Sequence, residues 1–303
     1  MRMAYLIMAH GDAAQLDMLV ERLVPAGSAD VAIIHADARS DLWQALRGRE
    51  DGERVRIVRD PVACLWGHKS QVEAIFKLID AALACDVDYA HLISGVDWPV
   101  AARSGIIADL SGPGPLPCCL EAIPGFVEFR MQTYRFDTRW LRLDLERERL
   151  AYALTWQLRR ASGWLDALRI RSGRERSRPF GQWHKGSTWW SLPRDVLEAI
   201  ACELPPLVAA GRLDGTQCAD EHLIQSFVAT RYRERLRDYR RFIVFPEGSS
   251  SPRLLAEADR AGITASGAWF ARKVSLGHDP FFLDFPADGP VQSALDSRQT
   301  GVS

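Results

Sequence analysis

Short apolar runs alternate with longer stretches of amphipathic spacing through the first hundred residues. The runs at residues 5–9 and 31–35 are almost wholly apolar, which is typical of strands buried on both faces, and a shorter run lies at residues 55–58. The stretches at residues 15–23 and 41–46 have the spacing of helices. A further helix is predicted from apolar positions that share one face, namely Val72, Ile75, Phe76, Ile79 and Leu83. Strands that alternate with helices predict an α/β fold, with a mostly parallel, doubly wound sheet flanked by helices.

The apolar run at residues 91–94 ends in a turn that carries one acid. Ser94 and Gly95 break the run, Asp97 follows, and Pro99 prevents further ladder pairing. Ligands of open α/β sheets bind beyond the carboxyl ends of the strands, so Gly95 and Asp97 are expected to face a substrate. The alternative is an ordinary turn in which Asp97 is a cap.

Alternation resumes in the second half of the chain. Residues 182–192 predict a glycine-hinged entry into a strand, residues 193–204 a helix, and residues 219–224 the start of another helix. We expect one domain over residues 1–286, followed by a loose polar tail at residues 287–303.

An arginine-dense segment separates the two regions of alternation, at about residues 122–180, with tryptophans interleaved. We interpret it as a variable, helical insertion. The spacing of Leu150, Leu154 and Leu158 predicts an amphipathic helix. Its basic side is either an ordinary solvated face, the commoner case, or a contact with a membrane surface or an acidic glycan.

Composition narrows the class of protein. With 303 residues, of which 47% are hydrophobic, the chain can bury a substantial core, and its net charge of −1 gives no reason to expect a nucleic acid partner. Six cysteines form no Cys-x-x-Cys pair, and we interpret them as reduced thiols, which favours the cytoplasm. The apolar opening ends too early for a signal-peptide core or a membrane span.

Several common catalytic motifs are missing. No strand-to-helix turn carries Gly-x-Gly-x-x-Gly or a P-loop, and we find neither Gly-x-Ser-x-Gly nor His-Glu-x-x-His. Asp220, Glu221 and His222 are consecutive, so they cannot converge on one metal ion from a helix face.

Four blocks of the first hundred residues, at 5–10, 34–40, 66–74 and 92–99, resemble in order and spacing the core-2/I-branching β-1,6-N-acetylglucosaminyltransferase and peptide O-xylosyltransferase family, glycosyltransferase family 14. Later blocks are also similar: Gly-Ser before paired aromatics at 186–190, an acidic block at 219–224, Ser-Pro-Arg at 251–253, and Phe-Ala-Arg-Lys at 270–273. The resemblance covers residues 4–274 with a gap at 122–180, and it implies that this variable insertion lies on the acceptor side. It implies a GT-A fold, an activated nucleotide-sugar donor and inversion at the anomeric carbon.

The resemblance also implies roles for individual residues. Glu221 corresponds to the catalytic base, and Asp220 before it is expected to cap the following helix. The expected donor-binding residues are His10, Asp37, Gly95, Asp97, Arg253, Arg272 and Lys273. Of these, Arg253 and Lys273 are expected to meet the negative charge of the departing nucleotide. The expected acceptor- or sugar-binding residues are Trp98, Ser187, Trp189 and Trp190. Paired tryptophans are also common as core residues.

Most GT-A enzymes hold the donor diphosphate through a divalent cation on Asp-x-Asp, after the strand that corresponds to residues 91–94. This chain offers only Asp97 there, and Asp86-Val87-Asp88 lies at the wrong end of the strand. We therefore expect no metal and no other cofactor. The sequence predicts an inverting, metal-independent glycosyltransferase.

We expect that enzyme to move GlcNAc or xylose from a UDP-sugar to a hydroxyl of a glycan or lipid-linked glycan, forming a β-linkage. It is expected in the cytoplasm, with peripheral contact at the inner face of the plasma membrane left open. The alternatives are other donor sugars (glucuronic acid, glucose or galactose), a non-catalytic nucleotide-sugar-binding relative, and an unrelated α/β nucleotide-binding protein.

Overall fold

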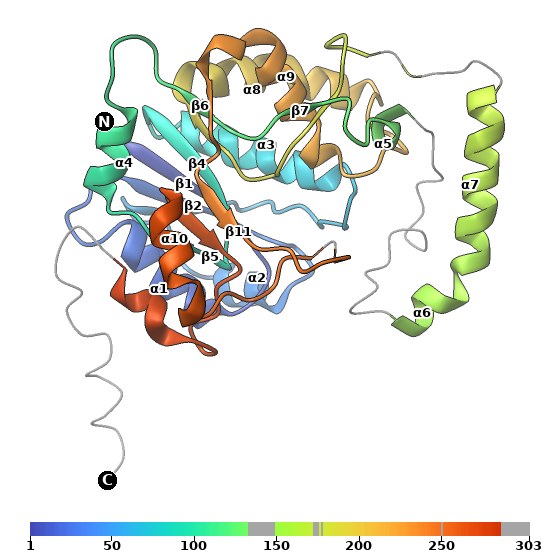
Figure 1. Ribbon diagram of the computed structural model, residues 1–303. Helices are drawn as coiled ribbons and strands as arrows, with labels where there is room; N and C mark the ends of the chain where they lie inside the picture. Colours follow the sequence, from blue (N-terminus) through green and yellow to red (C-terminus); the bar gives the residue numbers. More distant parts are fainter. Residues whose placement is uncertain (133–148, 172–175, 177, 250, 286–303) are drawn as a thin grey trace.

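The computed structural model describes residues 1–132, 149–171, 176, 178–249 and 251–285, and its centre is a seven-stranded sheet (Figure 1). In spatial order the strands are β10 (Leu236–Arg237), β6 (Cys118–Cys119), β9 (Ser191–Pro193), β4 (Tyr89–Ser94), β1 (Met3–Ala9), β2 (Val31–Ala36) and β3 (Val55–Ile57).

The seven-stranded sheet contains both parallel and antiparallel strand pairs. β1 is parallel to both β2 and β4, and β2 is parallel to β3, as the alternation of strands and helices predicted. β9, however, runs antiparallel to both β4 and β6. The sheet is therefore mixed, and the expectation of a mostly parallel sheet is wrong. An apolar pattern reports that a strand is buried, whereas the connection that precedes the strand sets its direction.

Two smaller sheets complete the strands. β11 (Arg241–Ile243), β12 (Phe270–Arg272) and β5 (Asp97–Pro99) form one of them, and β7 (Ile123–Pro124) pairs with β8 (His184–Lys185) in the other. β5 is antiparallel to β12, in a register that places Asp97 opposite Arg272. The turn after β4 is thereby joined to the last strand of the chain.

Side-chain caps mark where two of the early helices begin. The Asp12 carboxylate accepts a hydrogen bond from the Ala14 backbone N–H at 2.8 Å, and the Ser40 hydroxyl accepts one from the Trp43 N–H at 3.2 Å. The helices are α1 (Ala13–Leu23), α2 (Asp41–Leu46), α3 (Ser70–Leu83), α4 (Arg103–Leu110), α5 (Phe129–Gln132), α6 (Arg149–Leu154), α7 (Trp156–Arg171), α8 (Arg194–Ala209), α9 (Leu223–Arg231) and α10 (Arg260–Ser266). Short 3-10 turns include η2 (Ala219–Glu221), η3 (Arg233–Arg235), η4 (Glu257–Asp259) and η5 (Pro280–Asp284).

Two apolar clusters form the core, one on each face of the large sheet. One cluster contains Ala4 and Leu6 of β1 together with residues of α3, α8 and α9. The other contains Tyr5 and Ile7 of β1 together with residues of α1, α2, α4, α10 and β12. Alternate residues of β1 point to opposite faces, so this strand is apolar along almost its whole length. Figure 1 shows the resulting layers, with α3, α8 and α9 on one side of the strands.

Other sequence expectations have mixed outcomes. The helix expected at residues 193–204 continues as α8 to Ala209, through Pro205 and Pro206. The amphipathic helix expected around Leu154 is two helices, because α6 ends at Leu154 and α7 begins at Trp156. The tail at residues 287–303 and much of the arginine-dense segment lie outside the described residues.

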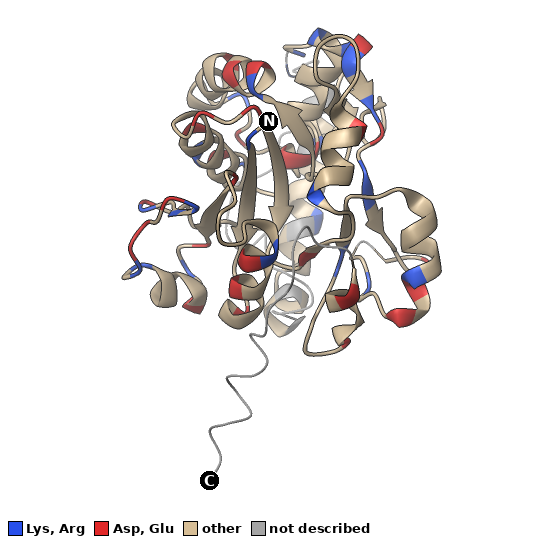
Figure 2. Ribbon diagram, turned by 90° about the vertical axis from the view of Figure 1, so that its left-hand side faces the viewer, with Lys and Arg blue, Asp and Glu red and all other residues tan. Residues whose placement is uncertain are grey.

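Basic and acidic residues are mixed along the chain of the described structure. Figure 2 shows them interspersed along the ribbon of the helices and loops. Among the described residues, no helix combines the length and apolar character needed to cross a bilayer.

Candidate functional site

The carboxyl ends of three parallel strands meet at one edge of the large sheet. Ala9 at the end of β1 lies opposite Ala36 at the end of β2, and Met8 lies opposite Ser94 at the end of β4. His10, Asp37 and Gly95 therefore follow neighbouring strands at the same edge, as open α/β sheets arrange their ligand-binding residues.

Backbone contacts hold this edge together. The Asp37 N–H donates to the Ala9 carbonyl at 2.9 Å, and the Gly95 N–H donates to the Met8 carbonyl at 3.0 Å. A Cβ on Gly95 would lie 3.1 Å from the Ala9 Cβ, so the close approach of the two chains favours glycine. The Asp37 carboxylate accepts from the Arg39 backbone N–H at 2.9 Å and pairs with the Arg39 guanidinium at 3.0 Å.

Asp97 is buried below the edge and does not face solvent. Its carboxylate accepts from the Ser94 N–H at 2.9 Å, from the Ser94 hydroxyl at 3.3 Å and from Arg272 Nη1 at 2.7 Å. The expectation that Asp97 faces a substrate is therefore wrong, because its carboxylate is directed at the turn and at Arg272. Its position makes it a positioning residue for Arg272.

Arg272 connects this turn with the aromatic block. Its guanidinium also donates to the Ser94 hydroxyl and lies 4.4 Å from the centroid of the Trp189 ring. Trp189 is half-buried, whereas Trp190 is fully buried in the core. An arginine over a tryptophan face is favoured by the ring quadrupole, so each side chain limits the movement of the other.

Trp98 and Trp190 do not present a surface to a sugar. Trp98 is buried, and its indole N–H donates to the Phe282 carbonyl at 2.9 Å. Trp190 packs in the apolar cluster formed with α3, α8 and α9. The expectation that these two rings bind sugar is wrong, since a buried ring offers no face to a ligand. Of the adjacent Trp189 and Trp190, Trp189 is the one that is partly exposed.

The two cations expected at the donor phosphates lie in neighbouring segments. Lys273 Nζ donates to the Ser251 hydroxyl at 2.9 Å, and the Lys273 carbonyl accepts from the Leu255 N–H at 2.9 Å. Arg253 makes a forked ion pair with Asp259, at 2.6 and 2.8 Å. The chain at residues 251–255 is thus held against the end of β12, which places Arg253 and Lys273 in adjoining backbone segments.

Glu221 ends the 3-10 turn η2, and its carboxylate is partly exposed. Glu221 Oε2 accepts from Arg130 Nη1 at 3.0 Å and lies 4.0 Å from Lys185 Nζ. The Glu221 carbonyl accepts from the Gly186 N–H at 2.9 Å. A Cβ on Gly186 would lie 1.8 Å from the Glu121 carbonyl oxygen, so only glycine allows this approach.

Asp220 does not cap the following helix, so this expectation is wrong. Helix α9 begins at Leu223, and its cap residue is His222. Asp220 is 7% exposed and accepts from the Thr188 hydroxyl at 2.7 Å, and its Oδ1 has no hydrogen-bond partner among the described residues. Burial, and after it the negative charge of neighbouring Glu221, raise the pKa of Asp220 to about 6. Asp220 therefore holds the segment at residue 188 and not the helix end.

Two groups near Asp220 are also buried. His222 Nδ1 lies 2.9 Å from the Cys218 carbonyl, and burial lowers the pKa of His222 to about 4, so the ring is neutral near pH 7. Gln225 donates to the Ser187 carbonyl at 2.7 Å and to the Asp220 carbonyl at 3.1 Å. Ser187 is thus fixed mainly through its backbone, although its hydroxyl also accepts from the Trp189 N–H at 3.4 Å.

Residues 188 and 189 join the two halves of the site. Thr188 binds Asp220, which precedes Glu221, while its neighbour Trp189 lies under Arg272, which pairs with Asp97. Four blocks that are far apart in the sequence therefore meet in one connected set of contacts. These blocks contain Ser94 and Asp97, Thr188 and Trp189, Asp220 and Glu221, and Arg272 and Lys273.

Sequence reasoning missed three side chains of this set. Arg130 lies in the segment where the family resemblance lapses, and Lys185 and Thr188 lie beside residues that were singled out. None of them has a motif of its own, because each is defined by a partner on another element. The residue types that pair with Glu221 become visible only when the chain is folded.

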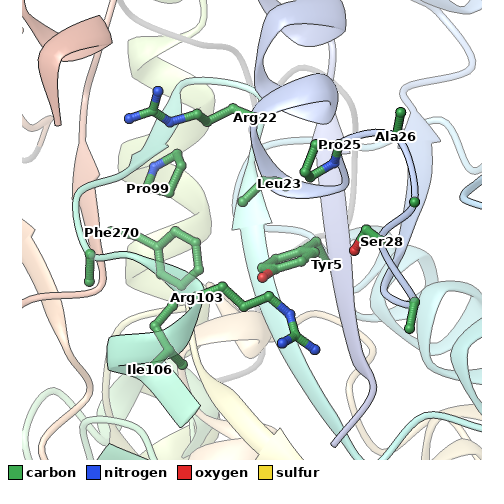
Figure 3. Close-up of a pocket in the computed structure, with 13 residues that line it drawn as sticks. Tyr5, Arg22, Leu23, Pro25, Ala26, Ser28, Pro99, Arg103, Ile106 and Phe270 are labelled. Atoms are coloured by element: carbon green, nitrogen blue, oxygen red, sulfur yellow. The ribbon is translucent and has the colours of Figure 1, made fainter. Parts of the chain in front are cut away.

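A separate cavity of about 350 Å³ lies between the end of α1, β5 and the start of α4. Figure 3 shows the Tyr5 and Phe270 rings among the side chains that line it, together with Arg22 and Arg103. None of the residues predicted for the donor or the acceptor lines it. Arg22 already donates to the Leu283 carbonyl at 3.4 Å and Arg103 is paired with Asp30, so their charge is largely committed within the fold.

No protein-family model matches the chain, and a search of curated proteins finds no significant match. Within the described residues, no group of three or more His, Cys, Asp or Glu side chains is placed to hold a metal ion. Function is therefore argued from the site itself.

Proposed function

We propose that this chain is an inverting, metal-independent glycosyltransferase that transfers a sugar from a UDP-sugar to an acceptor hydroxyl. The observation that carries the proposal is the link through residues 188 and 189, which brings an acidic block and a cationic block to one edge of an α/β sheet. A GT-A fold is part of this proposal. The mixed α/β sheet, with strand ends meeting at one edge, is compatible with it.

Glu221 is the general base of the proposed reaction. A single displacement with inversion needs one carboxylate that takes the proton of the attacking hydroxyl. Glu221 is partly exposed, and its ion pair with Arg130 fixes one oxygen while the other can meet an acceptor. Asp220 is unsuited to this role because it is buried and bound to Thr188.

Lys273, with Arg253, meets the negative charge that develops on the departing UDP. Preorganised cations at a leaving group stabilise the transition state, and lysine suits a point contact with phosphate. Arg272 instead orients Trp189, whose partly exposed ring suits the C–H bonds of a sugar. The proposed donor sugars remain GlcNAc and xylose, and the proposed acceptor is a glycan or a lipid-linked glycan.

The proposal places the reaction in the cytoplasm. All six cysteines are free thiols, which agrees with a reducing compartment.

A thermal-shift screen tests donor binding. UDP-GlcNAc, UDP-xylose, UDP-glucuronic acid, UDP-glucose and UDP-galactose are compared with GDP-mannose as the control nucleotide sugar. A ligand at one hundred times its Kd stabilises the native state by about 2.7 kcal/mol, so at least one UDP-sugar is expected to raise Tm. Lys273→Ala is expected to reduce the rise, whereas Lys77→Ala, a surface lysine of α3 paired with Asp60, is expected to leave it unchanged. A chain that no UDP-sugar stabilises would contradict the proposal.

A further inference from the structure

Helix α7 exposes several large apolar side chains, whereas its Ser162 is buried. Trp164 is 71% exposed, whereas Ser162, two residues earlier, is 6% exposed. Leu158, Leu165 and Leu168 are also exposed. A helix that packs on a protein core shows the opposite arrangement, so this exposed face lacks a covering surface among the described residues.

Four of the exposed positions of α7 form one stripe. Leu158, Ala161, Leu165 and Leu168 are separated by three, four and three residues, which places them on one side of the helix. The 16 residues of α7 extend over about 24 Å. Leu150 and Leu154 of α6, which directly precedes α7, are strongly exposed as well. The apolar surface therefore continues along both helices.

Helices α6 and α7 carry a net positive charge. Residues 149–171 contain one acid, Asp166, and five arginines, namely Arg149, Arg159, Arg160, Arg169 and Arg171. The guanidinium of Arg160 lies 4.8 Å from the centroid of the Trp156 ring. Tryptophans beside arginines are typical of helices at a membrane interface, where the ring lies at the level of the headgroups and the cation meets lipid phosphate.

We infer that α6 and α7 dock on an anionic lipid surface, with Leu158, Leu165 and Leu168 in the acyl boundary and the arginines at the lipid phosphates. The spacing of the stripe would also suit pairing with a second copy of the helix. An excess of four positive charges on each copy opposes that pairing and favours a negatively charged surface. Figure 1 shows α6 and α7 apart from the layered body, so a flat surface can reach them.

This inference does not depend on the proposed glycosyl transfer. None of Glu221, Arg272 or Lys273 belongs to α6 or α7. Binding to lipid and binding of a UDP-sugar can therefore be measured separately on the same variants.

Co-sedimentation with vesicles tests the inference. The full chain is mixed with vesicles of phosphatidylcholine alone, or of phosphatidylcholine with phosphatidylglycerol, at low and at high salt. Binding is expected with the anionic vesicles, and it is expected to weaken with salt because the lipid charges are screened. Leu158→Glu is expected to lower the partition coefficient about tenfold or more, since it removes one buried leucine and adds a charge of the wrong sign.

The chain offers a matched control. Phe245, after β11, has the same exposed fraction as Leu158, 56%, so Phe245→Glu changes an equally exposed apolar side chain elsewhere. This variant is expected to bind vesicles as the wild type does. A retained Tm for Leu158→Glu would show that the variant is folded, and a Leu165→Glu/Leu168→Glu variant provides a second, independent change on the same stripe.

Four results would overturn the inference. The first is that the wild type does not bind anionic vesicles at low salt, and the second is that wild type and Leu158→Glu bind them equally. The third is a concentration-dependent dimer that forms without lipid and that Leu158→Glu abolishes. The fourth is binding to an acidic polysaccharide without binding to vesicles. The third would assign the stripe to a second copy of the chain, and the fourth to an acidic glycan. None of them changes the expected binding of UDP-sugars.

Discussion

Arg272 lies 4.4 Å above the ring of Trp189 while its Nη1 donates to the Asp97 carboxylate at 2.7 Å. One guanidinium thus joins a buried acid in the turn after β4 to a half-buried ring that leads to β9. Asp97 holds Arg272, and Arg272 holds Trp189. The half-buried ring of Trp189 is therefore held in one orientation before any ligand arrives.

Removing Arg272 is expected to cost stability as well as activity. Arg272→Ala leaves the buried Asp97 carboxylate without its cation, which should lower the free energy of unfolding by about 3 kcal/mol or more. Arg253→Ala breaks an exposed pair with Asp259 and should cost at most about 1 kcal/mol. Urea denaturation of both variants checks the difference. Equal decreases in the free energy of unfolding would show that the Arg272–Asp97 pair contributes no more to stability than a surface ion pair does.

The adjacent residues Trp189 and Trp190 are expected to contribute differently to the free energy of unfolding. Trp190→Ala empties a fully buried core position and should cost about 3–5 kcal/mol. Trp189→Ala removes a half-buried ring and its contact with Arg272, for which about 1–2 kcal/mol is expected. Trp189→Ala should instead raise KM for the sugar substrates. If the KM values of Trp189→Ala equal those of wild type, the ring has no role in binding sugar.

These pairs show where sequence reasoning succeeds. Strands β1, β2 and β4 could be predicted because several consecutive apolar residues can be buried in few ways. The pairing of Asp97 with Arg272 spans 175 residues, and no local pattern specifies it. Trp189 and Trp190 look alike in sequence, since an aromatic pair does not reveal which ring faces the core. The direction of β9 and the burial of Asp220 likewise depend on tertiary neighbours.

Asp220 makes stability depend on pH. Its pKa of about 6 is above the ordinary value near 3.8, so the folded state binds this proton more tightly than the unfolded state. Below about pH 4 both states are protonated and the group contributes no penalty. As the pH rises from about 4 to 6, the unfolded state releases this proton while the folded state retains it, so the free energy of unfolding falls. The loss is about 2–3 kcal/mol by pH 7.

Asp220→Asn removes that penalty while it keeps an oxygen for Thr188. The stability gain of the variant over wild type should be clearly larger at pH 7.5 than at pH 4.5, as measured by chemical denaturation at both values. Glu221→Gln should give a smaller change in the same direction, because Glu221 contributes to the raised pKa of Asp220. A stability difference between wild type and Asp220→Asn that does not vary with pH would contradict this assignment.

Chelation tests how the leaving UDP is stabilised. If cationic side chains such as Lys273 take the place of a metal ion, turnover should be unchanged in excess EDTA. The assay is UDP release with and without EDTA, followed by addition of Mn²⁺. Activity that EDTA abolishes and Mn²⁺ restores would show that the reaction uses a metal site and that the role given to the side chains is incomplete.

Glu221 is the proposed base of the sugar transfer. The most direct test of this role is the rate of UDP release from saturating UDP-sugar by wild type and by Glu221→Gln. We expect the variant to be slower by roughly 10²–10⁴-fold, with the donor-induced rise in Tm retained. Glu198→Gln, which removes an acid paired with Arg194 on the surface of α8, should keep the wild-type rate. Near-normal UDP release by Glu221→Gln, or no UDP release by the wild type, would contradict this role.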